Sequence, residues 1–270
     1  MAAGVQGSES VQGRAPRILL YSHDTFGLGH LRRSRAIAQA LTAADPTASA
    51  LIVTGSPVAG RFDFSRRVDH IRLPGVTKLK DGSYVSQTLG LDIEETTELR
   101  AGIIRATAEK FQPDVLIVDK EPTGLRGELL PTLEHLLDAG RSRLVLGLRD
   151  VLDDPESLAA EWERKHAVEA TECYYDELWV YGLRSIFDAT EALPFSDSVR
   201  ARTHWTGYLK REAYAADEPP DPPYILVTPG GGGDGQALVD LVLRAYETDP
   251  DLSPRAIIVY GPFLSGEVRA

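Results

Sequence analysis

The chain has 270 residues, of which 43% are apolar, so it can bury a sizeable core, and disorder along its whole length is excluded. Its 29 basic and 40 acidic residues give a net charge of −11, which argues against a nucleic-acid partner, because such proteins need a basic surface. With one cysteine, no apolar run of about 20 residues and no segment of signal-peptide type, the sequence excludes a disulfide scaffold and predicts a cytoplasmic protein.

Residues 1–16 have the composition of a disordered tail. Beyond them, short β-branched runs alternate with longer helical patterns as far as residue 209. The expected strands are Arg17–Ser22, Ser49–Thr54, Val68–Leu73, Asp114–Asp119, Arg143–Leu148, Glu177–Gly182 and Thr203–Tyr208. The expected helices are 29–41, Ile93–Phe111, Gly127–Ala139 and Pro155–Tyr174, and residues 74–91 are expected to form a long polar loop.

Strands that are apolar on both faces and separated by helices predict an α/β fold with a mainly parallel, doubly wound sheet. This Rossmann-like N-terminal domain should span residues 17–209. Residues 210–223 hold four prolines and no apolar period, so we expect an interdomain linker there. A strand at Tyr224–Thr228, a helix at Gln236–Tyr246 and a strand at Ala256–Tyr260 then predict the start of a second Rossmann-like domain over residues 224–270.

The expected helix at Gln236–Tyr246 is apolar almost all round. Its apolar residues include Leu238, Val239, Leu241, Val242 and Leu243. Such a helix needs burial on several sides, which two strands alone do not provide. The sequence therefore predicts a C-terminally truncated two-domain chain, whose second domain would need about a hundred further residues.

A glycine turn follows the first expected strand, at the sheet edge where open α/β folds bind ligands. It contains Gly27 and Gly29, but Arg32 stands where a dinucleotide fingerprint would need a third glycine. His30 falls in the first turn of the next helix, where its imidazole can face the cleft as a general base. The alternative is that His30 only hydrogen-bonds a loop carbonyl.

Charged residues accompany this turn and follow two other expected strands. Arg33, with its neighbours Arg32 and Arg35, either binds phosphate or belongs to a solvated helix face. Carboxyl ends of parallel strands share one edge, so the residues after the fourth and fifth strands should line the same cleft. Their roles are either contacts to sugar hydroxyls or to His30, or helix capping and arginine pairing. These residues are Asp119, Glu121, Glu128, Arg149 and Asp150.

A second glycine turn, Gly230–Gly233, lies between the first strand and the helix of the expected second domain. Successive amides without side chains can form a nest for a diphosphate at a helix N-terminus. A flexible turn is the alternative. No Gly-Lys-Ser/Thr follows, so the segment is not a Walker loop.

Other kinds of site have weak signals. The six histidines show no metal-ligand spacing, so we expect no metal. The segment Val76–Leu91, with Lys78, Lys80, Tyr84 and Leu89, is the one candidate for weak peripheral membrane contact, and an ordinary mobile loop is the alternative.

The motifs together resemble a known family. Two Rossmann-like domains, the GxGH turn and the glycine-rich second turn are similar to the GT-B glycosyltransferases, and most similar to the glycosyltransferase family 28-like group. That group includes the enzyme that adds N-acetylglucosamine to the lipid-linked peptidoglycan precursor. The segments FGLGHLRRSRAIAQAL, DKEPTGLRGEL, GLRDVLDDP and HWTGYL resemble a bacterial group of predicted glycosyltransferases, over about Arg17 to Pro262.

The resemblance implies a hexosyltransferase that uses a nucleotide-diphospho-sugar donor and no cofactor. The second domain would bind the donor, with Gly230–Gly233 on its diphosphate, and the first would hold an acceptor of the cell envelope or another glycoconjugate, lipid-linked in related enzymes. His30 would be the base or an acceptor-side residue. The family's later donor-binding segment would lie beyond Ala270. A nucleotide-sugar hydrolase of the same fold and a truncated, non-catalytic binding protein are the alternatives.

Overall fold

The computed structural model describes residues 13–23, 28–79, 83–151, 155–188, 190–210, 222–230 and 235–261. Most of the expected N-terminal tail and of the expected linker therefore lies outside the described residues. The same holds for Gly27, Gly231, Gly232 and Gly233, so the proposed roles of these glycines stay predictions.

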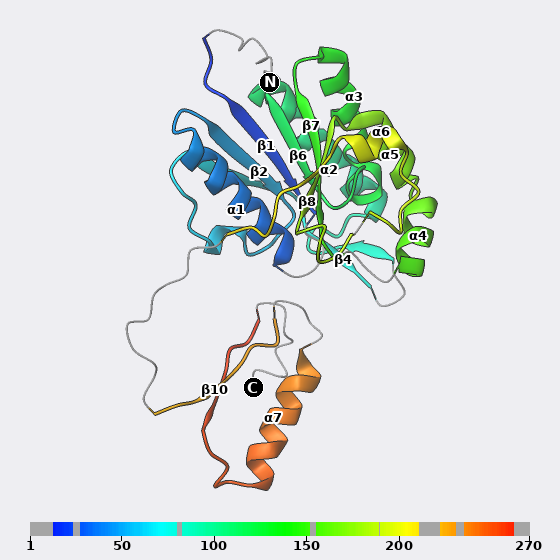
Figure 1. The fold of residues 1–270 in the computed structure, drawn as a ribbon. Helices are drawn as coiled ribbons and strands as arrows, with labels where there is room; N and C mark the ends of the chain where they lie inside the picture. Colours follow the sequence, from blue (N-terminus) through cyan, green and yellow to red (C-terminus); the bar gives the residue numbers. More distant parts are fainter. Residues whose placement is uncertain are drawn as a thin grey trace.

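Seven strands form one parallel sheet (Figure 1). Their order across the sheet is β3-β2-β1-β6-β7-β8-β9, and every neighbouring pair is parallel. The strands are β1 (Arg17–Ser22), β2 (Ser49–Thr54), β3 (Val68–Arg72), β6 (Val115–Asp119), β7 (Arg143–Arg149), β8 (Glu177–Tyr181) and β9 (Thr203–Trp205). The expected parallel, doubly wound sheet is confirmed.

Both faces of this sheet are buried. Side chains of successive strand residues point to opposite faces, so each strand contributes to a core cluster on either side. In β1, Leu19 and Tyr21 belong to one core cluster, and Ile18 and Leu20 belong to the other. Helix α1 (Gly29–Ala44) packs on the second cluster. The first cluster is covered by α2 (Ile93–Phe111), α3 (Leu130–Ala139), α4 (Pro155–Arg164) and α5 (Ala167–Tyr174), as Figure 1 shows.

The strand order reverses direction beside β1. The chain runs outward from β1 to β2 and β3, and then returns to place β6 on the other side of β1. Loops after β1 and β6 therefore leave the sheet on opposite sides and open a crevice between the two carboxyl ends, which is where open α/β sheets bind ligands.

The structure differs from the sequence-based expectation in several short elements. Residues 74–91, expected to be a loop, contain an antiparallel pair, β4 (Val76–Lys78) and β5 (Tyr84–Ser86). These strands are too short to show an apolar period. The helix expected at Pro155–Tyr174 is broken, because His166 has a left-handed φ of 50°. Similarly, a 3-10 turn (Leu125–Gly127) precedes α3, and a short α6 (Asp197–Ala201) precedes β9.

The C-terminal residues form a second, smaller β-α-β unit. It contains β10 (Ile225–Val227), α7 (Gln236–Thr248) and β11 (Ala256–Ile258), and the two strands pair in parallel. Of the apolar residues of α7, Val239 is buried, whereas Leu238, Leu241 and Leu243 are 44%, 67% and 42% exposed. Burial of this helix on several sides is therefore not found within the described residues.

Candidate active site

His30 and Asp119 meet at the crevice between β1 and β6. His30 is the second residue of α1, and Asp119 is the last residue of β6. The Nδ1 atom of His30 lies 2.7 Å from Oδ2 of Asp119. The Asp119 side chain is only 5% exposed, whereas that of His30 is 20% exposed. The carboxylate of this pair is thus buried, whereas the imidazole is partly accessible to solvent.

Arg33, one turn after His30 on α1, also binds Asp119. Its Nε donates to Oδ1 at 2.8 Å and its Nη2 to Oδ2 at 3.0 Å, a two-pronged contact. The guanidinium carbon of Arg33 lies 5.8 Å from the ring centre of Tyr181. Of the three arginines on this helix, Arg33 therefore orients the carboxylate, while Arg35 lies over the rings of Phe62 and Phe64 and Arg32 is exposed.

The charge of Asp119 fixes the protonation of the imidazole that it contacts. Burial raises the pKa of Asp119, but the hydrogen bond from His30 and the charge of Arg33 together lower it below its usual value. An ionised carboxylate only accepts hydrogen bonds, so Nδ1 of His30 carries the proton and donates it to Asp119. In the neutral form of the imidazole, the lone pair is then on Nε2, the nitrogen that a ligand can reach. This is the arrangement of a general base with an orienting carboxylate.

His23 is a second histidine at the crevice, directly after β1. It is 7% exposed, and its ring packs edge-on to that of His30 at 5.9 Å between centroids. Burial lowers the pKa of His23 well below its usual value, and the nearby positive charges of Lys120, Lys165 and Arg100 lower it further. His23 is thus a neutral ring beside the candidate base. No role for His23 was expected from the sequence, although its position one residue after a strand was a signal.

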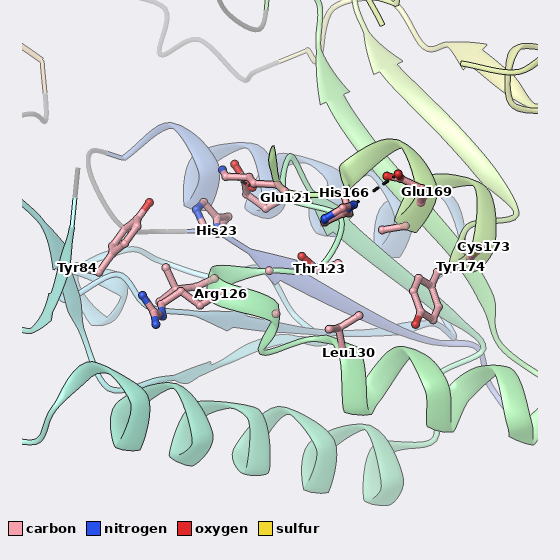
Figure 2. A pocket seen from close by; sticks show the side chains of 15 residues that line it. His23, Tyr84, Glu121, Thr123, Arg126, Leu130, His166, Glu169, Cys173 and Tyr174 are labelled. Atoms are coloured by element: carbon pink, nitrogen blue, oxygen red, sulfur yellow. Dashed lines mark hydrogen bonds and ion pairs between the residues drawn. The ribbon is translucent and has the colours of Figure 1, made fainter. Parts of the chain in front are cut away.

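Two cavities adjoin these histidines. The smaller, of about 360 Å³, is lined by His23, His30, Lys78, Leu79, Tyr84, Lys120, Glu121, Glu161 and Lys165. The larger, of about 600 Å³, shares His23, Tyr84, Glu121 and Lys165 with the smaller and continues to the loop before α3 and to α5. Figure 2 shows Tyr84 and Arg126 at one end of the larger cavity and Cys173 and Tyr174 at the other.

Glu121 is one of the expected cleft residues that the structure places at these cavities. Its Oε2 lies 2.9 Å from Nζ of Lys165, which also contacts Oε1 of Glu161 at 2.6 Å. Burial lowers the pKa of Lys165, but the two carboxylates raise it by more, so the lysine stays charged. Lys165 was not foreseen; its only signal was the spacing of four residues from Glu161, typical of a helical ion pair.

Glu128, also expected at the cleft, is instead fully buried beneath it. Arg100 on α2 donates to both oxygens of Glu128, at 2.5 Å and 2.7 Å, and the Tyr21 hydroxyl donates to the carboxylate at 2.6 Å. The backbone N–H of Leu125 in turn donates to the Tyr21 oxygen at 3.1 Å. Glu128 therefore forms the arginine pair that was its alternative role, and the network holds the loop that lines the larger cavity.

The remaining expected residues are less central. Arg149 ends β7 and Asp150 follows it, but neither residue lines the two cavities, and the carboxyl group of Asp150 interacts with the Tyr208 hydroxyl. Gly29 begins α1 without a positive φ, and a Cβ there would meet open space, so its backbone does not require glycine. Gly230, the one described residue of the four-glycine segment, has a left-handed φ of 81°, as a nest of amides requires.

Two negative findings hold for the described residues alone. Within them, no group of three or more histidine, cysteine, aspartate and glutamate side chains is arranged to hold a metal ion. None of their helices is both long enough and apolar enough to cross a lipid bilayer. Lys78 and Tyr84, which the sequence marked as a candidate membrane contact, line the cavity beside His30.

Comparisons with known proteins give the fold type. No protein-family model matches the chain, and no curated protein does. The solved glycosyltransferase SnogD from Streptomyces nogalater is similar at 19% identity and a TM-score of 0.50, over 92% of this chain and 67% of that one. The glycotransferase of kitacinnamycin is similar at 15% identity and a TM-score of 0.50, over 94% of this chain and 67% of that one.

The chain has a GT-B fold of the glycosyltransferase-like type. A UDP-N-acetylglucosamine 2-epimerase structure is also similar, at 12% identity and a TM-score of 0.48, over 95% of this chain and 64% of that one. The chain thus spans about two thirds of the length of these structures. In this GT-B fold the His30–Asp119 pair belongs to the N-terminal Rossmann-like domain, and Gly230 follows the first strand of the smaller C-terminal unit.

Proposed function

We propose that this protein is a glycosyltransferase that moves a sugar from a nucleotide-diphospho-sugar donor to an acceptor hydroxyl, with His30 as the general base. One observation carries the proposal. The imidazole is bonded through Nδ1 to a buried, ionised carboxylate, and it lines a cavity at the strand reversal of the sheet. Membership of the family 28-like group is part of the proposal and rests on motifs such as FGLGHLRRSRAIAQAL.

The reaction follows from the lone pair on Nε2 of His30. The acceptor hydroxyl gives its proton to Nε2, and its oxygen forms a bond to the anomeric carbon of the sugar. The bond from that carbon to the diphosphate oxygen breaks, and the nucleoside diphosphate leaves with the electron pair. Asp119 stabilises the imidazolium that forms. A positioned base of this kind contributes about 100- to 10,000-fold to the rate.

The donor diphosphate would bind the turn between β10 and α7. Gly230 has a positive φ, and a Cβ at Gly235 would lie 2.2 Å from Cβ of Pro229, so only a residue without a side chain fits there. A glycine-rich segment before a helix can present backbone amides to an anion. Those amides would stabilise the charge of the leaving group, so the proposal needs no metal.

The test is a transfer assay with the full chain, a panel of nucleotide-diphospho-sugars and an aryl alcohol acceptor. Release of nucleoside diphosphate and of glycosylated acceptor is measured for the unchanged protein, His30→Ala and His135→Ala. His135 lies on α3 and lines neither of the two cavities, so it is the matched control. We expect His30→Ala to lose about 100- to 10,000-fold in turnover while donor binding is retained.

Other results would reject the assignment. Undiminished turnover in His30→Ala would remove the histidine from the mechanism. Release of free sugar at the same rate with and without acceptor would identify a hydrolase. Tight donor binding without any turnover by the unchanged chain would identify a non-catalytic binding protein.

A further inference from the structure

Three lysines from separate elements line the smaller cavity beside His30. Lys78 is the last residue of β4, Lys120 follows β6, and Lys165 follows α4. Their gathering is unexpected in a chain whose net charge is −11.

The pairing of these lysines is uneven. Lys165 is held by Glu121 and Glu161 at 2.9 Å and 2.6 Å. Lys120 has Glu121 at 3.9 Å, a carboxylate that Lys165 already contacts more closely. For Lys78, no carboxylate oxygen lies within 4 Å among the described residues, and its ammonium instead lies 5.9 Å from the ring centre of Tyr84. Three lysines thus face two carboxylates at this cavity, an excess of one positive charge, and Lys78 and Lys120 are the two lysines without a close ion pair.

The field at the cavity wall agrees with this count. Burial lowers the pKa of His23, the neutral ring that lines both cavities, and the charged groups that lower it further are all cations. The lysines likewise act on Glu161: burial raises its pKa, but Lys165, Lys120 and Lys78 together lower it below the usual value. The potential at His23 and Glu161 is thus positive, whereas at Tyr84, whose pKa burial raises, Glu121 and Glu161 raise the pKa further and Lys165 lowers it.

The larger cavity has more apolar side chains in its lining than the smaller one. Its lining includes Leu125, Leu130, Ala170 and Tyr174, with backbone of the loop before α3. The two cavities share His23, Tyr84, Glu121 and Lys165, so a single ligand can occupy both. Such a ligand has an apolar body in one and an anionic group in the other.

We propose that the protein binds an amphiphilic oxyanion, a molecule whose phosphate or carboxylate group contacts Lys78 and Lys120 beside His30 and whose apolar body fills the larger cavity. Its designation as the acceptor rests on the proposed glycosyl transfer. Lysine ammonium groups bind phosphate as point charges, and an apolar cavity adds affinity in proportion to the area it buries.

The test uses calorimetric titration of the full chain, at low ionic strength and without donor, with three matched probes. Phenyl phosphate and phenylacetate carry a ring and an anionic group, and benzyl alcohol carries a ring without charge. We expect at least one of the two anions to bind about 10-fold or more tightly than benzyl alcohol, and to lose affinity as salt is added. The stronger of the two identifies the anionic group.

The lysines are tested by the double variant Lys78→Gln, Lys120→Gln, which leaves the ion pairs of Lys165 in place. We expect its affinity for the preferred anion to fall about 10-fold, and the variant Lys78→Arg, Lys120→Arg to restore most of it. Lys110→Gln, an exposed lysine in the last turn of α2, is the matched control and should bind as the unchanged protein does. Equal melting temperatures would show that all variants are folded.

Cys173 reports whether the apolar body enters the larger cavity, because it is the only cysteine of the chain and it lines that cavity. We expect phenyl phosphate to slow the labelling of Cys173 by a maleimide, and inorganic phosphate at equal occupancy to leave the rate unchanged. Equal labelling with and without phenyl phosphate would overturn the placement of the apolar body.

Three outcomes would overturn the proposal: anions that bind no more tightly than benzyl alcohol, a double glutamine variant with unchanged affinity for them, or one that loses affinity for UDP instead. The last would assign the lysines to the donor. The proposed function fails separately, since anion binding measured without donor does not depend on sugar transfer. Transfer to neutral acceptors alone would keep the glycosyltransferase and reject the anionic ligand.

Discussion

Nδ1 of His30 and Oδ2 of Asp119 lie 2.7 Å apart although 89 residues separate them in the chain. The parallel pairing of β1 with β6 produces this contact. Asp119 ends β6 at the edge where β1 also ends, and α1 begins seven residues after β1. The contact therefore depends on the sheet, because the pairing of β1 with β6 brings the end of β6 beside the edge where α1 begins.

Asp119→Asn tests whether this contact orients the base. An asparagine side chain can present its amide N–H to Nδ1, which stabilises the tautomer with the proton on Nε2 and removes the lone pair from the reacting side. We expect kcat to fall about 100- to 10,000-fold with little change in KM. Steady-state kinetics measures both. A kcat within about threefold of the unchanged protein would mean that Asp119 does not act through His30.

Arg33→Met tests the electrostatic support of Asp119. Burial raises the pKa of this carboxyl group, and Arg33 is one of the groups that bring it below the usual value. Without the guanidinium, the pKa should rise, so the carboxylate should become protonated at a higher pH. We expect the acid limb of the kcat/KM profile to move to higher pH. Arg32→Met, at an exposed neighbouring position, should leave the profile unchanged.

His23 should make the protein less stable in acid. Burial and nearby cations hold its folded-state pKa well below the usual value, so the unfolded chain binds a proton that the folded chain does not. Below about pH 6.5, the free energy of unfolding should therefore fall by about 1.4 kcal/mol per pH unit from this group alone. Above that pH, the neutral His23 no longer lowers the free energy of unfolding.

Urea unfolding of the unchanged protein and of His23→Gln at several pH values isolates this term. We expect the difference between the two slopes below pH 6.5 to equal about one proton. Equal slopes for the unchanged protein and His23→Gln would contradict a neutral, buried His23.

Arg100 and Glu128 form the buried pair beneath the larger cavity. Either single change, Arg100→Met or Glu128→Leu, leaves the other charge buried without its partner, and we expect it to cost about 3–5 kcal/mol of unfolding free energy. The double change should cost less than either single change. Arg105→Ala, which breaks an exposed ion pair with Glu109 on the same helix, should cost at most about 1 kcal/mol. Urea denaturation measures each value.

The sequence was sufficient for the parallel sheet because its strands are long apolar runs, such as Asp114–Asp119 and Arg143–Leu148. It also placed His30, Arg33, Asp119 and Glu121 at one sheet edge, since parallel strands end on the same side. It could not distinguish a cleft role for Glu128 from pairing with Arg100, because that depends on where α2 packs. The three-residue strands β4 and β5 show no period, so the position of Lys78 and Tyr84 beside His30 could not be foreseen.

The crystal structure of the full chain with a nucleotide-diphospho-sugar would test the central claim most directly. We expect the diphosphate to contact the backbone amides of Gly230–Gly233 and the anomeric carbon to lie opposite Nε2 of His30, with space between them for an acceptor oxygen. A diphosphate bound away from that turn, or a sugar whose anomeric carbon faces away from His30, would contradict the account.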